Sequence, residues 1–401
     1  MQSSDPEHFF ETDAAQEKRQ RRAAKSNNKY GNPITLKSKI LAAIPDPRAP
    51  SSAVLVAESA GAVRLVNLND PEDTKTTYRG PAAPISSLAV GGPHSSLLFA
   101  GCWDKAIWSW DLSTGDPGRK YLGHTDFVKA LACARVGGRD LLISGGADKK
   151  IIVWDVASGR RLHTLQDGVV NMLSVQDLVV DHAASANGEE EVVVISASSD
   201  PHIRRWRVRL DGWELVAETA PEGPKGTERR TILEHETTVY KLVLDHDGGE
   251  EVDLWSSSGD GTAKCLSRLK NFTCEDTFHH GDHVRAVAVT EQWVVTAGRD
   301  EDVKFWDRGS GKLYCALVGH YDEVTELVVM RGPSGAAERL CSVSIDGTVR
   351  TWPLAKAGLD AAVKEQEKPV EEEGKEEVGG GGMFSAEEEA ELAALMEGDD
   401  E

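Results

Sequence analysis

A short pattern, an Asp followed six residues later by a Trp, recurs along the chain and constrains its fold more than any other feature. The five copies are Asp104 with Trp110, Asp148 with Trp154, Asp200 with Trp206, Asp300 with Trp306, and Asp346 with Trp352. A sixth copy, Asp260, has Leu266 where the Trp would stand. Successive Asp residues lie 40 to 60 residues apart, a spacing typical of arrays in which each unit packs on its neighbours. The sequence therefore predicts repeated small units rather than one globular core.

The residues around Asp148 indicate what each unit is. Two apolar, β-branched runs, 141–144 and 151–155, flank a turn of small residues at 145–148, as expected for two strands and a tight connection. Residues 127–134 and 161–165 read as a third and a fourth strand. Four short antiparallel strands per unit are typical of one propeller blade.

These units resemble the WD-repeat family. The resemblance rests on Gly123-His124 at one end of a unit and Trp154-Asp155 at the other, on Gly319-His320 with Trp352, and on Trp306-Asp307 with Asp300. In that family a His, a Ser or Thr, the turn Asp and the Trp form a hydrogen-bonded tetrad in each blade. The resemblance implies three complete tetrads: His124, Ser144, Asp148 and Trp154; His280, Thr296, Asp300 and Trp306; and His320, Ser342, Asp346 and Trp352.

Other units match the tetrad only in part. The second has Pro81 and Ala100 in place of the His and Ser; the fourth keeps Ser196, Asp200 and Trp206 without a His; the fifth has His235, Ser256 and Asp260 without a Trp. We expect these blades to depend more on packing, and the three complete blades to form the rigid side of the ring. The blades around Pro81, residues 165–171 and Leu266 are therefore the first places to look for a partner.

A first unit without tetrad residues, with strand-like runs at 38–45, 53–57, 62–68 and 75–78, brings the count to seven. The fold predicted is all-β: a seven-bladed WD-repeat β-propeller spanning residues 31–358. The last strand recognised, 348–352, is only the third of its blade, so the ring needs an outer strand from elsewhere. Residues 32–36 are the candidate, since a strand from the N-terminus would hide two open sheet edges.

Both ends of the chain are predicted to be appendages. Residues 1–30 form a charged, disordered segment whose basic cluster at 18–25 is either a nuclear-import signal, an anchor on an acidic surface, or a solvated charged stretch. Residues 359–382 form an acidic, Gly-rich flexible linker. Residues 383–401 form an acidic short amphipathic helix or linear motif, in which Leu392, Leu395 and Met396 make one apolar stripe. This tail either folds on a partner's groove, docks on the propeller or stays disordered.

Composition narrows the class of protein further. The net charge of -21 disfavours direct nucleic-acid binding, which requires clustered Lys and Arg. Six Cys without a Cys-x-x-Cys pattern suggest buried, reduced thiols, and no apolar run approaches the length of a membrane span. We expect a soluble, intracellular protein of the nucleus or cytoplasm, with no membrane contact.

No residue pattern supports catalysis. The Ser, His and Asp of the tetrad recur in several blades, whereas an active site has no reason to be copied around a ring. The cluster 279–283 contains His280, already assigned to a tetrad, and offers no Cys or second carboxylate at metal-ligand spacing. We therefore expect no enzyme activity, no cofactor and no metal site.

We therefore expect the protein to act by binding partners through its surface. The loop into the first strand and the loop between the second and third strands share one face of a blade, which brings Trp103, Phe127, Arg299 and Tyr321 to one rim of the channel. These residue types anchor interfaces, although Phe127 could instead begin a buried strand. Residues 206–209, Trp-Arg-Val-Arg, resemble the Trp-Asp-x-Arg motif of cullin-ligase substrate receptors, with Arg207 replacing the Asp. Loops at 181–190 and 211–230 lengthen the fourth blade.

These surfaces support three functional hypotheses. The first is a non-catalytic WD-repeat scaffold or adaptor that binds other proteins within a multiprotein complex, as a monomeric ring. The second is a subunit of a nuclear RNA-processing, ribosome-assembly or chromatin complex. The third is a substrate receptor of a cullin-type ubiquitin ligase.

Overall fold

The computed structural model describes residues 16, 19–20, 22–23, 25–26, 28–70, 72, 76–168, 171–182, 190–219, 228–229, 231–245 and 252–368. The chain divides into two units, residues 1–363 and 364–401, and the strands found among the described residues belong to the first. The C-terminal motif with Leu392, Leu395 and Met396 lies outside the described residues, as do most of the linker and residues 1–15.

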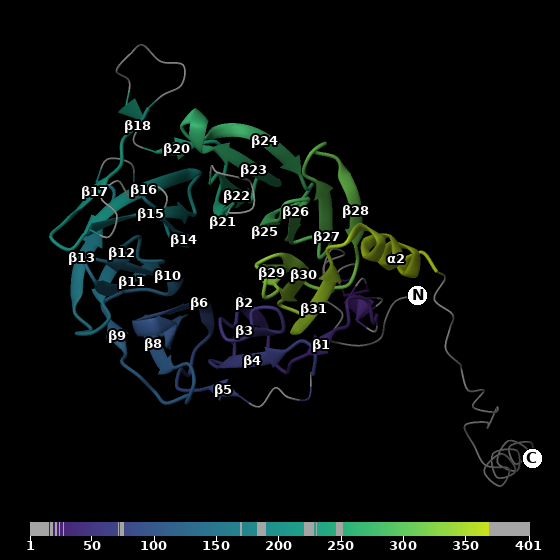
Figure 1. Ribbon diagram of the computed structural model, residues 1–401, viewed down its shortest axis with the longest axis horizontal. Helices are drawn as coiled ribbons and strands as arrows, with labels where there is room; N and C mark the ends of the chain where they lie inside the picture. The colour runs from purple at the N-terminus through teal and green to yellow at the C-terminus, as the bar shows by residue number, and fades with distance from the viewer. Residues whose placement is uncertain are drawn as a thin grey trace, which may run out of the picture. The chain divides into compact units, whose positions relative to one another are not determined.

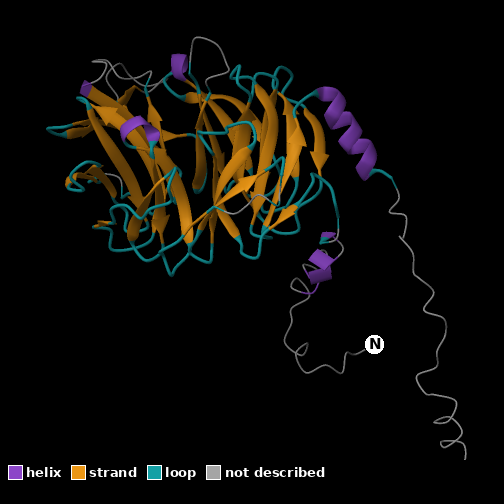
Figure 2. Cartoon of the chain, turned by 60° about the horizontal axis from the view of Figure 1, so that its bottom comes forward, coloured by secondary structure: helices purple, strands orange, loops and turns teal. Residues whose placement is uncertain are grey.

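Seven antiparallel sheets of the first unit surround a central channel, as Figure 1 shows. Seen from the side in Figure 2, the strands run between the two faces of the ring and the loops gather on those faces. The seven-bladed β-propeller predicted from the repeats is confirmed. In blades 1 to 6 the first strand lies at the channel and the next three follow outward in chain order; in blade 7 the outermost strand comes from the N-terminus.

The strands of the first four blades are short and mostly buried. Blade 1 holds β2 (Ile40–Pro45), β3 (Ala53–Glu58), β4 (Val63–Asn67) and β5 (Thr77–Tyr78); blade 2 holds β6 (Ile85–Gly91), β7 (Leu97–Cys102), β8 (Ala106–Asp111) and β9 (Tyr121–Leu122); blade 3 holds β10 (Val128–Val136), β11 (Arg139–Gly146), β12 (Ile151–Asp155) and β13 (Arg161–Leu165); blade 4 holds β14 (Val175–Asp181), β15 (Glu191–Ser198), β16 (His202–Arg209) and β17 (Trp213–Leu215). Blade 4 gains a fifth strand, β20 (Ile232–Leu233), which pairs with β16, and a separate hairpin of β18 (Glu218–Thr219) and β19 (Glu228–Arg229) comes after β17.

The remaining blades complete the circle. Blade 5 holds β21 (Val239–Leu244), β22 (Leu254–Ser258), β23 (Thr262–Ser267) and β24 (Thr273–His279); blade 6 holds β25 (Val284–Val289), β26 (Trp293–Gly298), β27 (Val303–Asp307) and β28 (Leu313–Leu317); blade 7 holds β29 (Val324–Arg331), β30 (Ala337–Ser344), β31 (Thr348–Pro353) and, from the N-terminus, β1 (Ile34–Thr35). Single 3-10 turns occur at η2 (Pro93–Ser95) and η4 (Arg268–Lys270).

An N-terminal strand closes the ring, as predicted. Ile34 of β1 pairs with Val349 of β31 in antiparallel register, so the last blade takes its outer strand from the beginning of the chain. Without it, β31 would present a free edge of backbone donors and acceptors.

Residues before β1 also contact blades 6 and 7, although the segment 1–30 was expected to be disordered. The guanidinium of Arg22 pairs with the carboxylate of Asp322, and Lys25 Nζ lies 3.1 Å from a carboxylate oxygen of Glu301. The side-chain amide of Asn28 donates to the carbonyl of Gly319 at 2.7 Å. Two basic side chains of this segment therefore pair with acidic side chains of the ring.

The hydrophobic core lies between neighbouring blades. One cluster, for example, joins Ile143 and Val153 of blade 3 to Val194 and Trp206 of blade 4. A single blade therefore buries its apolar faces only against its neighbours, which is the usual reason repeat units do not fold alone.

Helix α2 (Lys356–Gln366) comes after the last strand and crosses the boundary expected at residue 358. Leu359 is fully buried, and Ala362 and Val363 pack in the same cluster as Trp293 of blade 6. The Tyr314 hydroxyl hydrogen-bonds the Asp360 carboxylate, and Figure 1 shows α2 beside β28. The flexible linker expected from residue 359 is thus helical up to Gln366, because Leu359, Ala362 and Val363 recur at helical spacing. Among the described residues, no helix is long and apolar enough to span a membrane.

Candidate functional site

The residues of the third unit's tetrad are connected by hydrogen bonds. His124 Nδ1 lies 2.9 Å from an Asp148 carboxylate oxygen, and His124 Nε2 lies 2.8 Å from Ser144 Oγ. Trp154 Nε1 donates to the same Ser144 Oγ at 2.8 Å. The chain of contacts links the loop leading into β10, the β11–β12 turn and two strands of blade 3.

Blades 6 and 7 repeat this arrangement. In blade 7, His320 contacts Asp346 at 3.0 Å and Ser342 Oγ at 2.7 Å, and Trp352 donates to Ser342. In blade 6 the imidazole is turned over: His280 Nδ1 contacts Thr296 and Nε2 contacts Asp300, both at 2.8 Å, and Trp306 Nε1 donates to Thr296.

The electrostatics of the tetrads favour an ionised Asp beside a buried His. Burial alone would raise the pKa of Asp300, but hydrogen bonds from His280 and Lys304 outweigh it and lower the pKa to about 2. Burial lowers the pKa of His320 below its usual value, although Asp346 opposes that shift. A contact set that is buried and repeated in three blades is structural in kind.

The incomplete blades satisfy their turn Asp with other donors. In blade 2, Asp104 accepts a hydrogen bond from Trp108 Nε1 at 2.9 Å. In blade 4, the guanidinium of Arg204 lies 3.1 Å from both Asp200 and Asp167. These contacts hold the turn Asp in blades that lack the complete tetrad.

Blade 5 keeps its His in place although the Trp is missing. His235 contacts Asp260 and Ser256, both at 2.8 Å. Leu266, which stands where the Trp would be, is fully buried in a cluster with Phe272.

A β-bulge recurs at the same position of the innermost strand in all seven blades. Each pairing between the first and second strands skips one residue at the end where the strand begins. A bulge leaves one residue unpaired and can re-aim its side chain. The seven skipped residues all line one cavity of about 570 Å³ and are called the bulge ring: Leu41, Ser86, Lys129, Gln176, Tyr240, Arg285 and Thr325.

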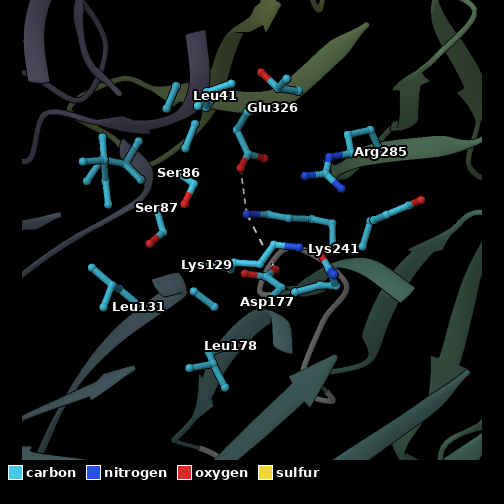
Figure 3. A pocket seen from close by; sticks show the side chains of 18 of the residues that line it. Leu41, Ser86, Ser87, Lys129, Leu131, Asp177, Leu178, Lys241, Arg285 and Glu326 are labelled. Carbon is cyan, nitrogen blue, oxygen red and sulfur yellow. Dashed lines mark hydrogen bonds and ion pairs between the residues drawn. The ribbon is translucent and has the colours of Figure 1, made fainter. Parts of the chain in front are cut away.

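Three charged side chains that line this cavity, Asp177, Lys241 and Glu326, form a network of ion pairs. Lys241 Nζ lies 2.8 Å from Glu326 and 3.7 Å from Asp177, so one ammonium joins blades 4, 5 and 7 (Figure 3). Burial alone would lower the pKa of Lys241, but the two carboxylates raise it instead. Burial raises the pKa of Glu326.

Two other cations face the same cavity: Lys129, which in the described part of the chain pairs with no carboxylate, and Arg285, whose carboxylate partner is distant. Lys129 Nζ donates to Gln176 Oε1 at 2.8 Å, and burial together with the neighbouring Arg285 lowers the pKa of Lys129 to about 8. The Arg285 guanidinium lies over the Tyr240 ring at 4.6 Å, with Glu323 4.0 Å away. Figure 3 shows Lys129, Lys241 and Arg285 converging on the channel from three blades.

An aromatic pair stands at the rim of this cavity. Trp103, from the β7–β8 turn, and Phe127, from the loop before β10, stack with centroids 4.8 Å apart and planes 11° from parallel. They are 39% and 38% exposed, so Phe127 does not begin a buried strand. The stack joins both kinds of loop on one face of the ring, and Trp103 also lines the cavity.

The other two rim candidates, Arg299 and Tyr321, lie apart from that stack. Arg299 is exposed on the β26–β27 turn. The Tyr321 hydroxyl donates to the carbonyl of Asp346 at 3.0 Å. Within the described part of the chain, neither residue lines the cavity.

Sequence reasoning missed the polar members of the bulge ring. A signal was available: a residue that interrupts an apolar inner strand, directly after its first Val, as in Val128-Lys129 and Val284-Arg285. Strand alternation alone would assign these side chains to one sheet face or the other, whereas the bulge directs them into the channel.

Two other features of the sequence, the Trp-Arg-Val-Arg stretch and the cysteines, show no sign of a binding site in the described residues. Arg209 of the Trp-Arg-Val-Arg stretch pairs with Glu191 at 2.9 Å, and Arg207 pairs with Glu214 at 2.6 Å. All six cysteines are free, and burial raises the pKa of Cys102 to about 11 and that of Cys341 to about 12. In the described ranges, no group of three or more His, Cys, Asp or Glu side chains could hold a metal ion.

Comparison with known proteins agrees with this architecture. Residues 118–215 match the family described as the tRNA methyltransferase TRM82 WD40 domain, and residues 72–111 and 272–307 match the WD domain, G-beta repeat. An uncharacterized WD repeat-containing protein of Schizosaccharomyces pombe is 29% identical over 365 residues, covering 88% of this chain and 90% of the relative.

Two other relatives are matched over a smaller part of their length. The nuclear distribution protein PAC1 of Arthroderma otae is 26% identical over 71% of this chain and 53% of its own length. The autophagy-related protein 16 of Arabidopsis thaliana is 22% identical over 69% of this chain and 49% of its own length, so the chain spans about half of each of these two. With repeats, relatives and seven blades in agreement, the chain belongs to the WD-repeat family of β-propeller proteins.

Proposed function

We propose that this protein is a non-catalytic scaffold that binds another protein through the face of the ring carrying the channel mouth. The observation that carries the proposal is the exposed stack of Trp103 on Phe127. Aromatic side chains dominate the energetics of interfaces, and a stacked pair is already ordered before binding, which lowers the entropic cost of association.

The surroundings of the stack suit an interface. The aromatic rings border a cavity whose wall is polar and charged, including Lys129, Gln176 and Glu323. An apolar anchor beside polar groups that fix orientation is the usual anatomy of a specific contact. Residues from blades 2 and 3 contribute the anchor, so the partner would sit off the centre of the ring.

Paired affinity purifications test the proposal. Full-length tagged protein and the variant Trp103→Ala with Phe127→Ala are purified in parallel and their partners quantified by mass spectrometry. We expect at least one partner to be depleted 10-fold or more, since loss of two aromatic anchors typically costs several kcal/mol of binding. The matched control is Leu269→Ala, which removes a 74% exposed apolar side chain from the η4 turn of blade 5. Retention of every partner by the double variant would refute the proposal.

A second candidate is a subunit of an RNA-modifying methyltransferase complex. It is favoured by the match of residues 118–215, in blades 3 and 4, to the TRM82 domain family. Because a net charge of -21 disfavours binding to phosphates, we expect the partner to make most of the RNA contacts. Methyl transfer to tRNA by the purified complex, measured with labelled S-adenosylmethionine and lost in a methyltransferase-depleted sample, would support this candidate.

The same purification addresses the wider hypothesis of a nuclear RNA-processing, ribosome-assembly or chromatin complex. Exclusion of a fluorescent fusion from the nucleus would count against it. The substrate-receptor hypothesis has less support, because Arg207 and Arg209 are paired with Glu214 and Glu191.

A further inference from the structure

We infer that the cavity at the channel mouth receives an acidic side chain of the partner: a carboxylate enters between Lys129 and Arg285, while a neighbouring apolar residue of the same segment packs on Trp103 and Phe127. The inference rests on the proposed function and specifies the chemistry of the partner, namely a peptide segment with an Asp or Glu next to a hydrophobic residue.

Of the two cations, Lys129 has no carboxylate within ion-pair distance among the described residues, and Arg285 has only a distant one. Among the described residues, no carboxylate lies within 4.0 Å of Lys129 Nζ, whose hydrogen bond goes to the neutral amide of Gln176. Arg285 has Glu323 only at the 4.0 Å limit. Partly buried cations are usually paired, since losing water without gaining a counter-charge is unfavourable.

Lys129 and Arg285 are also placed so that both can donate to one ligand in the cavity. Lys129 and Arg285 come from bulges in β10 and β25 and line the same cavity. An ammonium has three donors, of which Gln176 takes one. The guanidinium lies over the Tyr240 ring, 4.6 Å from its centroid; this contact restricts the guanidinium, whose donors suit the planar carboxylate.

The charge count favours one carboxylate over a nucleic-acid strand. Three cations, Lys129, Lys241 and Arg285, share the cavity wall with Asp177, Glu323 and Glu326, and Lys241 is already used by Asp177 and Glu326. Lys129 and Arg285 are then opposed by Glu323 alone, which leaves one positive charge at their end of the cavity for a partner's carboxylate. A series of phosphates would instead meet all three carboxylates and a chain of net charge -21.

Proton linkage provides an independent signature. Lys129 faces Arg285 across the cavity, Gln176 and Asp177 on β14, Lys241 on β21, Glu326 on β29 and Asp126 in its own loop. Burial and Arg285 lower its pKa to about 8, and a bound carboxylate would raise that pKa again. Affinity should then be greatest below pH 8 and should fall as the pH rises through 8 and Lys129 loses its proton.

The test uses a phage library of random dodecamer peptides selected on the full-length protein. We expect enrichment of sequences with Asp or Glu beside an aromatic or aliphatic residue, and no such enrichment on the variant Lys129→Met with Arg285→Met. Thermal unfolding of this variant checks its fold, and Lys129→Arg, which keeps the charge, should retain peptide binding. Absence of acidic enrichment on the wild type, or acidic enrichment on both proteins, would overturn the inference.

Affinity measurements on the selected peptide sharpen the result. We expect Lys129→Met to weaken binding 10- to 100-fold, replacement of the peptide's Glu by Gln to weaken it equally, and the two changes together to cost little more than one. Tighter binding of a single-stranded oligouridine than of the peptide would also overturn the inference. Loss of peptide binding in the Trp103→Ala, Phe127→Ala variant but not in Lys129→Met would leave the scaffold proposal standing and remove only the carboxylate receptor.

Discussion

Blades 3, 6 and 7 have complete tetrads, whereas blades 2 and 4 lack the His and blade 5 keeps its His but lacks the Trp. In the first group a His joins the turn Asp to a Ser or Thr and, through it, to a Trp. In the second group the Asp remains but its donor is a Trp in blade 2 and an Arg in blade 4. The comparison teaches that the turn Asp is the constant element, and that the surrounding donor can change without loss of the blade.

Blade 4 departs furthest from the tetrad. Arg204 is fully buried and bridges Asp200 to Asp167, while Trp206 still donates to Ser196 at 2.8 Å. A buried charge network is costly to assemble but strongly destabilising to break. The incomplete blade should therefore contain the most sensitive single position in the ring.

Replacing Arg204 by Met should have the largest effect. The change removes the guanidinium shared by the buried carboxylates of Asp167 and Asp200, and we expect the free energy of unfolding to fall by about 3 to 5 kcal/mol. Urea denaturation followed by tryptophan fluorescence measures the loss. Arg161→Met, at an exposed position of β13, is the control and should change stability by less than about 0.5 kcal/mol. A loss below about 1 kcal/mol for Arg204→Met, the size of an ordinary substitution, would show that this network is not a substitute for the His.

Restoring the missing Trp of blade 5 should also destabilise. Leu266 is fully buried among Phe272 and its neighbours, so Leu266→Trp overfills that space, at a cost of about 1 to 3 kcal/mol. The matched change is Leu266→Met, which conserves volume and should cost less. Stabilisation by Leu266→Trp, seen as a rise in the melting temperature, would mean that the tetrad outweighs packing.

A smaller difference in stability is expected when the Ser of a complete tetrad in blade 3 and the Ser of the incomplete tetrad in blade 5 are each replaced by Ala. Ser144→Ala removes the contact of His124 Nε2 and the acceptor of the Trp154 N–H, whereas Ser256→Ala removes only the contact to His235. Because each unsatisfied buried group costs about 1 to 3 kcal/mol, Ser144→Ala should lose about 1 kcal/mol more. Equal losses in parallel denaturation curves would argue that the Trp contributes nothing through its N–H.

The smallest expected effect is the dependence of the free energy of unfolding on pH, to which each titrating side chain contributes only a little. The pKa values of Asp148, Asp346 and His320 lie below their usual values, and that of Asp300 falls to about 2. The unfolded chain then binds more protons, so stability is complete above about pH 6.5 and is lost as the pH falls towards 2. Glu326 and Asp302, whose pKa values are raised by burial, oppose this trend but are fewer than the groups whose pKa values are lowered. Urea midpoints at pH 7, 5 and 3 should fall in that order; a rise on acidification would contradict the assignment.

The fold was predictable because its signal is repeated. The Asp-to-Trp pattern places a turn in six blades, and the shortage of an outer strand in the last blade predicted the pairing of residues 34–35 with β31. The side chains at the channel were not predictable from alternation, because one bulge per inner strand redirects Lys129, Tyr240 and Arg285. The contacts of Arg22 and Lys25 with Asp322 and Glu301 join residues far apart in sequence, which no local pattern reports.

The pairing of β1 with β31 also means that the ring can close only late in translation. Ile34 leaves the ribosome early, but its partner Val349 emerges only after almost the whole ring has been made. At typical rates of translation this is a delay of roughly 15 to 60 s. During that interval the first strand has no sheet to join and the growing ring has an open end. A nascent chain stalled before residue 349 should therefore expose residues 34–35 to proteolysis or to a chaperone, and release of the full chain should protect them.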